Sequence, residues 1–232
     1  MVEQKKPIYS SFNNFKKLKG VEPLGKDEKL YVFDLDYTLY PFSLNFVEEI
    51  EYSFCQFLEE FLRKKVDKND LNDLEKELPD GDGCLFRRSI EKYNVTKNDL
   101  KNLHDKVNFQ KKLFKDEELI KIFENLNGRL FIMTNGIRYH IESCLKKMEI
   151  EHFFEYIIFC DPFEPKRLCK PMFEAFESIN KTLNIENKKN VLFFDDSLKN
   201  INAANKSGWT SYLVTENNEI KDILLKNFNN NS

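Results

Sequence analysis

The chain has 232 residues, of which 41% are hydrophobic and 32% are charged, a balance that excludes general disorder, a collagen-like fibre and a membrane-embedded protein. Its net charge is -3, from 36 basic and 39 acidic residues, so the composition offers no basic surface and we expect no nucleic-acid partner. No stretch approaches the ~20 apolar residues of a membrane span.

The five cysteines are odd in number and include no C-x-x-C pair. Neither a disulfide framework nor a zinc knot is therefore predicted, and a reducing compartment is favoured. The first residues lack the apolar core of a secretory signal. These features together predict a soluble cytoplasmic protein, with the nucleus as a further location.

The N-terminal segment, residues 1–28, is polar and rich in lysine, and Pro7, Gly20 and Pro23 interrupt it. We expect it to form a loosely docked arm. The first apolar run follows at 30–33, with the sequence LYVF. This run is continuous rather than alternating, which is typical of a strand buried on both faces of a parallel sheet.

A long insert separates this strand from the next one. It is far longer than the roughly 2–6 residues of an ordinary strand-to-helix loop. Apolar residues recur in it at helical spacing, as at Phe46, Ile50, Phe54 and Phe57, and a Pro-Asp-Gly-rich break follows at 79–83. The pattern predicts a small all-helical domain inserted over residues 42–114.

From residue 115 onward, strand and helix patterns alternate. The predicted strands span 129–133, 156–160, 191–194 and 210–214, and the predicted helices span 117–126, 138–148, 172–183 and 198–205. This alternation predicts an α/β fold with a doubly wound, mostly parallel, Rossmann-like sheet and right-handed crossovers. Residues 29–41 and 115–232 would form this core domain.

Polar groups follow four of the predicted strands in turn. They are Asp34 and Asp36, then Thr134, Asn135 and Gly136, then Lys170, and finally Asp195, Asp196 and Ser197. Each aspartate taken alone also fits a turn former or a helix N-cap. Ligands of open α/β sheets bind outside the carboxyl ends of the strands, however, so the shared position favours one common site.

Several carboxylates that converge on one point repel each other unless a cation neutralises them. A hard, oxygen-seeking ion such as Mg2+ fits this set. The three histidines, His104, His140 and His152, have no metal-ligand spacing, so zinc is disfavoured and each is expected at the surface or in packing. Mg2+ with a hydroxyl, a backbone turn and a lysine is typical of phosphoryl transfer.

These motifs resemble those of the haloacid dehalogenase superfamily. The stretch DLDYTL from Asp34 matches its D-x-D-x-T signature, and Thr134, Lys170 and the Asp195-Asp196 pair match its later motifs in the same order. The resemblance covers about residues 29–216. Within the superfamily, MTNGIRYHIESCLKKMEI and FFDDSLKNINAANKSGW resemble the pyrimidine 5'-nucleotidase-like phosphatases of fungi and plants, a group that includes enzymes acting on lysophosphatidic acid.

The resemblance implies a role for each motif residue. Asp34 would attack phosphorus, and Asp36 would protonate the leaving alcohol and then activate water. Mg2+ would be held by the Asp34 carboxylate, the Asp36 backbone carbonyl, and Asp195 or Asp196. The hydroxyl of Thr134 and the backbone amides of Asn135 and Gly136 would hold phosphoryl oxygens, and Lys170 would balance charge.

The second aspartate narrows the activity within the superfamily. Relatives that cleave carbon–halogen bonds lack it, so Asp36 implies a phosphatase or a phosphomutase. We expect a Mg2+-dependent phosphomonoesterase for a small phosphorylated substrate, with pyrimidine 5'-nucleotides first. Another small ester, such as lysophosphatidic acid or a sugar phosphate, is the alternative, and an inactive scaffold of this fold is a further one.

The resemblance implies that the helical insert, residues 42–114, is a cap domain, and substrate choice is expected to lie there. Arg87 lies in a Gly-to-Arg stretch that resembles part of the relatives' cap, and His104 and Lys106 lie where relatives carry a polar loop that faces the site. A solvated surface arginine is the alternative for Arg87. A signalling receiver domain also groups Asp, Thr and Lys around Mg2+, but such domains are about half this length and have no helical insert.

Overall fold

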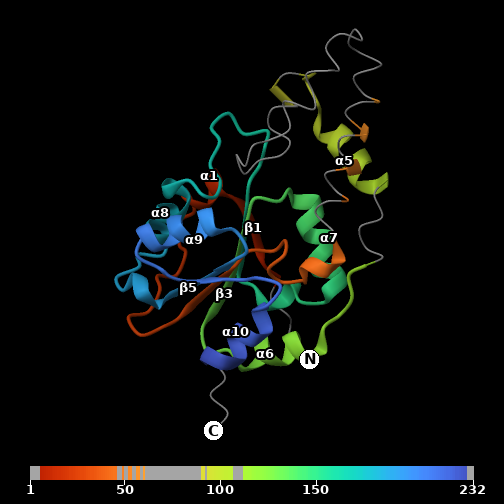
Figure 1. Ribbon diagram of the computed structural model, residues 1–232. Coiled ribbons are helices and arrows are strands. Elements are labelled where there is room, and N and C mark those ends of the chain that lie inside the picture. The colour runs from red at the N-terminus through yellow and green to blue at the C-terminus, as the bar shows by residue number, and fades with distance from the viewer. Residues whose placement is uncertain are drawn as a thin grey trace.

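The computed structural model describes residues 6–45, 93–106 and 112–228, together with residues 49, 52, 53, 56, 57, 60, 90 and 91. Its centre is a six-stranded sheet in which every neighbouring pair is parallel (Figure 1). The strand order is β1-β4-β3-β2-β5-β6. The predicted doubly wound, parallel α/β fold is therefore confirmed.

The strands agree closely with the apolar runs in the sequence. They are β1 (Ile8–Ser11), β2 (Leu30–Phe33), β3 (Arg129–Thr134), β4 (Tyr156–Phe159), β5 (Val191–Asp195) and β6 (Thr210–Leu213). β2 lies at the centre, with β3 on one side and β5 on the other. The chain reverses its winding direction there, which makes the carboxyl end of β2 the switch point where ligands of such sheets bind.

Helices cover both faces of the sheet. They are α1 (Phe12–Phe15), α6 (Glu117–Asn125), α7 (Arg138–Met148), α8 (Phe173–Thr182), α9 (Leu198–Lys206) and α10 (Ile220–Phe228). One core cluster joins the sheet to α6, α7 and α10 through residues such as Phe33 and Leu145. The other joins it to α1, α8 and α9 through residues such as Phe193 and Trp209. Because both faces are packed, the strands need no polar alternation.

The expectation of a loosely docked N-terminal arm is wrong for residues 8–15. Residues Ile8–Ser11 pair in parallel with β4 as an edge strand, and Phe12 and Phe15 of α1 are fully buried. The sequence IYSS has little apolar character, and Ser10 and Ser11 are nevertheless buried. A search for apolar runs cannot identify a strand whose inward positions are serines.

The last helix, α10, is also absent from the predicted elements. Its apolar residues Ile220, Ile223 and Leu224 follow helical spacing and are buried. This periodicity could have identified it. The helix packs beside α6 in one of the two core clusters.

Part of the predicted cap domain is described. A short 3-10 helix, η1 (Phe42–Leu44), follows β2, and α5 (Lys97–Lys106) lies beyond the sheet, on the side of α7 (Figure 1). The division of the chain into an arm, a core and a cap over 42–114 remains a prediction. Among the described residues, no helix has the length and apolar character needed to cross a membrane.

Candidate active site

The polar groups predicted to meet at the carboxyl edge of the sheet do lie on neighbouring strands. Asp34 directly follows β2, Thr134 ends β3 and Asp195 ends β5. The backbone N–H of Asp34 donates to the carbonyl of Phe194 at 2.8 Å, which ties the end of β2 to β5. The central strands therefore fix the backbone at the site.

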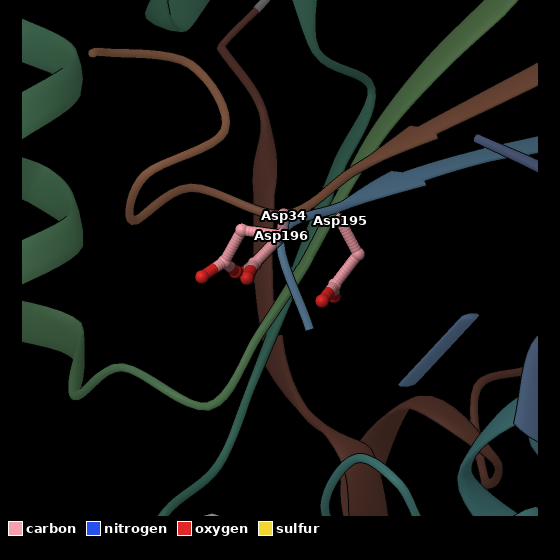
Figure 2. A group of neighbouring side chains, drawn as sticks. All are labelled: Asp34, Asp195 and Asp196. Atoms are coloured by element: carbon pink, nitrogen blue, oxygen red, sulfur yellow. The ribbon is translucent and has the colours of Figure 1, made fainter. Parts of the chain in front are cut away.

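Three carboxylates form an acidic group at this edge. Asp34, Asp195 and Asp196 each offer an oxygen within 4.8 Å of the others, and Figure 2 shows their side chains at the ends of β2 and β5. Burial raises the pKa of Asp34 well above its usual value. The charge of Lys170 lowers this pKa and the charge of Asp195 raises it, and the effect of burial is the largest. Burial and the charge of Asp195 raise the pKa of Asp196 to about 6. These shifts are typical of negative charge that lacks full compensation.

Lys170 supplies a cation to two of these carboxylates. Its Nζ lies 2.8 Å from Asp34 Oδ1 and 2.6 Å from Asp195 Oδ2, and its side chain is only 1% exposed. Burial alone would lower the pKa of Lys170, but Asp195 and Asp34 raise it above its ordinary value. The lysine is therefore charged at neutral pH.

Asn135 holds Lys170 in place. Its side-chain Nδ2 donates to the Lys170 carbonyl at 2.8 Å, and its Oδ1 accepts from the Lys170 backbone N–H at 2.9 Å. The side chain of Asn135 thus joins the loop after β3 to the loop after β4. Because this side chain is engaged, the expected contact of Asn135 with substrate would be made by its backbone N–H.

Both oxygens of Asp195 are engaged within the protein. Oδ1 accepts from the Ser197 backbone N–H at 2.8 Å, and Asn200 Nδ2 donates to Oδ1 and Oδ2 at 2.9 and 3.1 Å. Asn200, in the first turn of α9, was absent from the predicted site. It lies five residues beyond Asp195, so that a helix starting at Leu198 would bring it back to the strand end.

Thr134 and Gly136 form the turn beside this group. The Thr134 side chain is buried, and its Oγ1 accepts from the Gly136 backbone N–H at 3.0 Å. A Cβ at position 136 would lie 3.3 Å from Thr134 Oγ1 and 3.6 Å from Asp36 Oδ2. Gly136 therefore lies against both the threonine hydroxyl and the second aspartate.

Asp36 has partners of its own, separate from Lys170. Its Oδ1 lies 2.6 Å from His140 Nε2 and accepts a hydrogen bond from the Tyr40 hydroxyl. Burial would raise the pKa of Asp36, but His140 and then the Tyr40 hydroxyl lower it below its ordinary value. Burial would lower the pKa of His140, yet Cys144 and Asp36 raise it well above the usual value.

His140 was expected at the surface or in packing, and the structure instead brings it to the site. Neither His140 nor Tyr40 was predicted to contact the acid. His140 lies in the first turn of α7, six residues after Thr134, and Tyr40 is four residues beyond Asp36. Only the proximity of these positions to the strand ends could have pointed to them.

The predicted substrate contacts from the cap are only partly described. His104 of α5 is half-buried, and its ring lies 6.5 Å from that of Tyr139, the neighbour of His140 on α7. Burial and then the charge of His140 lower the pKa of His104. Arg87 and the side chain of Lys106 lie outside the described residues.

The donor set of this edge fits a hard divalent cation. All three members of the group offer carboxylate oxygens, and Mg2+ takes oxygen ligands at about 2.0–2.1 Å. The raised pKa of Asp34 marks the charge that such a cation would offset. Asp34, Asp196 and the backbone carbonyl of Asp36 are available to hold it, whereas Asp195 is already bonded on both oxygens.

Comparison with known proteins agrees with the motifs. Residues 31–214 match the family model described as haloacid dehalogenase-like hydrolase. Phosphate metabolism protein 8 of Saccharomyces cerevisiae is 25% identical over 203 residues. This match covers 78% of the present chain and 59% of the yeast protein, so the chain spans less than two thirds of that relative's length.

Solved structures show the same fold. A haloacid dehalogenase-like family hydrolase from Xanthomonas campestris has a TM-score of 0.53 at 12% identity, over 86% of this chain and 88% of that one. A β-phosphoglucomutase from Clostridium difficile has a TM-score of 0.50 at 17% identity, over 84% and 88%. The L-2-haloacid dehalogenase of Xanthobacter autotrophicus has a TM-score of 0.50 at 18% identity, over 81% and 77%. At such identities the likeness concerns the fold alone.

Proposed function

Because the chain belongs to the haloacid dehalogenase-like hydrolases, we propose that it hydrolyses small phosphomonoesters through an aspartyl-phosphate. The observation that carries this proposal is the pair Asp34 and Asp36 at the end of β2, whose carboxylates have different partners. Asp34 pairs with Lys170, and Asp36 pairs with His140. A nucleophile and an acid/base two residues apart suit the displacement of an alcohol from phosphorus.

In the first half-reaction, a carboxylate oxygen of Asp34 attacks phosphorus and the bond from phosphorus to the ester oxygen breaks. The Asp36–His140 pair carries one proton, which Asp36 passes to that oxygen, so a neutral alcohol leaves. Lys170, charged and buried beside Asp34, offsets the negative charge of the phosphoryl group. The hydroxyl of Thr134 and the backbone N–H of Asn135 hold its outer oxygens.

In the second half-reaction, a water molecule gives a proton to Asp36 and attacks phosphorus. The bond from phosphorus to Asp34 breaks, and inorganic phosphate leaves. Asp34 is again a carboxylate, and the Asp36–His140 pair again holds one proton. The net reaction consumes one phosphomonoester and one water, and produces one alcohol and one phosphate.

The acidic group would hold Mg2+ through Asp34, Asp196 and the carbonyl of Asp36. Mg2+, when bound, supplies Lewis-acid polarisation and neutralises the charge between nucleophile and phosphate. Asp196 is the better direct ligand because Asp195 already accepts hydrogen bonds on both oxygens. In this arrangement Asp195 holds Lys170 in position.

For the substrate, we propose 5'-nucleotides, with pyrimidine nucleotides first. The support is the resemblance of the stretches around Thr134 and Asp195 to pyrimidine nucleotidase-like phosphatases, and the similarity to a yeast protein named for phosphate metabolism. Arg87, His104 and Lys106 of the insert would contact the nucleoside. The odd number of cysteines supports a reducing, cytoplasmic setting.

The test is release of inorganic phosphate from UMP, CMP, AMP, a lysophosphatidic acid and several sugar phosphates, with Mg2+ and with a chelator. We expect turnover that requires Mg2+, that is greatest on UMP or CMP, and that is lost in Asp34→Asn. Asp27→Asn is the matched control. Asp27 is exposed and precedes β2, so it lies at the amino ends of the strands, opposite the site. Turnover that survives in Asp34→Asn would contradict the covalent route, and a higher rate on lysophosphatidic acid would contradict the nucleotide assignment.

A further inference from the structure

The described partners of Asp36 contact one oxygen of its carboxylate. His140 Nε2 lies 2.6 Å from Oδ1, and the Tyr40 hydroxyl donates to the same atom. Among the described residues, no hydrogen bond engages Oδ2. The two partners reach Asp36 from different elements, because Tyr40 lies in the turn after β2 and His140 lies in α7.

The other oxygen, Oδ2, lies beside the turn proposed to bind the phosphoryl group. A Cβ at Gly136 would lie 3.6 Å from Asp36 Oδ2 and 3.3 Å from Thr134 Oγ1. Oδ2 and Thr134 Oγ1 thus both lie beside Gly136, in the turn whose hydroxyl would hold a phosphoryl oxygen. Oδ1 faces the buried side, where His140 is 6% exposed and Tyr40 is 4% exposed.

The histidine ring is itself fixed. Cys144, one helical turn further along α7, places its Sγ 3.6 Å from His140 Nδ1. Its neighbours Ile141 and Leu145 are fully buried and anchor α7 on the sheet. The position of Nε2 thus follows from the packing of a helix against the core, and not from a mobile loop.

An acid that donates a proton in a displacement must point along the bond that breaks, and a misplacement of about 1 Å can cost about 10²-fold in rate. Lys170 orients Asp34 and Asp195, whereas the Asp36 carboxylate is 26% exposed and, in the part of the chain that the structure describes, is oriented by His140 and Tyr40. We propose that His140 and Tyr40 are positioning residues that hold Oδ1 of Asp36 so that Oδ2 exchanges the proton with the leaving group and with water. This proposal rests on the proposed phosphomonoesterase activity.

The sharpest test separates esters that need the proton from esters that do not. p-Nitrophenolate leaves without protonation, whereas the alcohol of UMP requires it. In His140→Leu and in Tyr40→Phe, rapid mixing with p-nitrophenyl phosphate should give a burst of p-nitrophenolate at nearly the wild-type rate. Steady turnover should then fall by about 10²-fold, because the second half-reaction still needs Asp36 to activate water. With UMP the first half-reaction itself should slow by about 10²-fold, with little change in KM.

A rescue variant and two controls complete the series. His140→Gln keeps an N–H donor at a similar reach, so it should recover much of the UMP rate that His140→Leu loses. Tyr31→Phe removes the hydroxyl of another buried tyrosine, and His152→Leu changes an exposed histidine. Both controls should behave as wild type. A p-nitrophenolate burst that slows as much as the UMP reaction, or a Gln variant no better than the Leu variant, would reduce His140 to a packing role.

A second measurement does not depend on turnover. In protein labelled with 15N-histidine, the His140 Nε2 resonance should shift in Asp36→Asn and stay unchanged in Asp27→Asn. The absence of a shift would overturn the positioning contact whatever the activity. A shift together with a wild-type protein that forms no phosphoenzyme with any ester would overturn the proposed function and leave the contact standing.

Discussion

Lys170 has an ammonium group that lies inside the protein between two carboxylates. In the sequence it is a lysine before a proline, and only its place after the third predicted strand suggested a role. In the structure its Nζ contacts both Asp34 and Asp195 at hydrogen-bonding distance. A cation in this position decides whether two buried acids can both be charged.

The effect of removing that cation on stability can be measured. Lys170→Met keeps most of the side-chain volume but leaves two buried carboxylates without their partner, and breaking such a pair costs about 3–5 kcal/mol. We expect urea denaturation in a buffer with chelator to show a loss of this size. Lys166→Met, at an exposed position of the same loop, should change the free energy of unfolding little. Equal losses in the two variants would contradict the assignment.

The sequence located the residues whose position follows from a strand end. Asp34, Thr134 and Asp195 each stand where an apolar run stops, and parallel strands gather such positions at one edge. Tyr40 and His140 could not be located in this way. Their contact with Asp36 depends on how a turn folds back and on where the first turn of α7 comes to lie, and no local spacing records either.

At the scale of elements, β1 and α1 show that the N-terminal segment is part of the core. β1 extends the sheet beyond β4, and Phe15 of α1 packs edge-on against Phe131 and Tyr156. Phe15→Ala would leave a cavity between helix and sheet, and such truncations cost about 3–5 kcal/mol. Chemical denaturation should show this loss, whereas Phe173→Ala, at a half-exposed position, should cost far less. A loss at Phe15 no larger than at Phe173 would mean that the arm docks loosely after all.

A second element-scale prediction concerns the start of α6. Asp116 accepts hydrogen bonds from the backbone N–H groups of Glu118 and Leu119 and pairs with Lys221 of α10. Burial would raise its pKa, but the Leu119 amide and Lys221 lower it below 3.8. Because the folded-state pKa is the lower one, this stabilisation is present above the unfolded pKa and is lost as the pH falls through the folded one.

Asp116→Ala should therefore cost about 1 kcal/mol at neutral pH. The difference from wild type should shrink as the pH falls below 3.8, the ordinary value for this side chain. Thermal unfolding at a series of pH values measures it. Glu124→Ala, at an exposed position in the last turn of the same helix, should show no such dependence. A pH-independent cost at Asp116 would exclude the charged cap as its cause.

For the whole molecule, the acidic group would couple stability to the proposed Mg2+. Asp34, Asp195 and Asp196 converge within 4.8 Å, so the repulsion that Lys170 leaves uncompensated opposes folding. Mg2+ that binds only the folded state should raise the free energy of unfolding by about 2.7 kcal/mol at a hundred times its dissociation constant. In chelator, Asp196→Asn should be more stable than wild type. Its free energy of unfolding should rise much less than that of wild type when Mg2+ is added, and scanning calorimetry can measure both effects. If Mg2+ raised the free energy of unfolding of Asp196→Asn as much as that of wild type, the direct ligand would be Asp195 instead.

The fold as a whole was predictable because its inner strands are continuous apolar runs, and the family match confirms the resemblance carried by the motifs at their ends. The edge strand β1 was not predictable. β1 places serines at its buried positions, so its pairing with β4 depends on backbone hydrogen bonds and on the two phenylalanines that follow. Tertiary pairing decides such a strand, and composition does not record it.

The pairing of β1 with β4 also sets an order of events during synthesis. β1 precedes β4 in the chain, but β4 is translated only after the insert, α6, β3 and α7. β2 and β3 can pair in the meantime, and the outer side of β4 stays open until β1 docks on it. An unpaired strand edge in a nascent chain is a site for association with other chains. β1 therefore waits for β4, and its pairing covers an edge of the sheet that would otherwise be open to other chains.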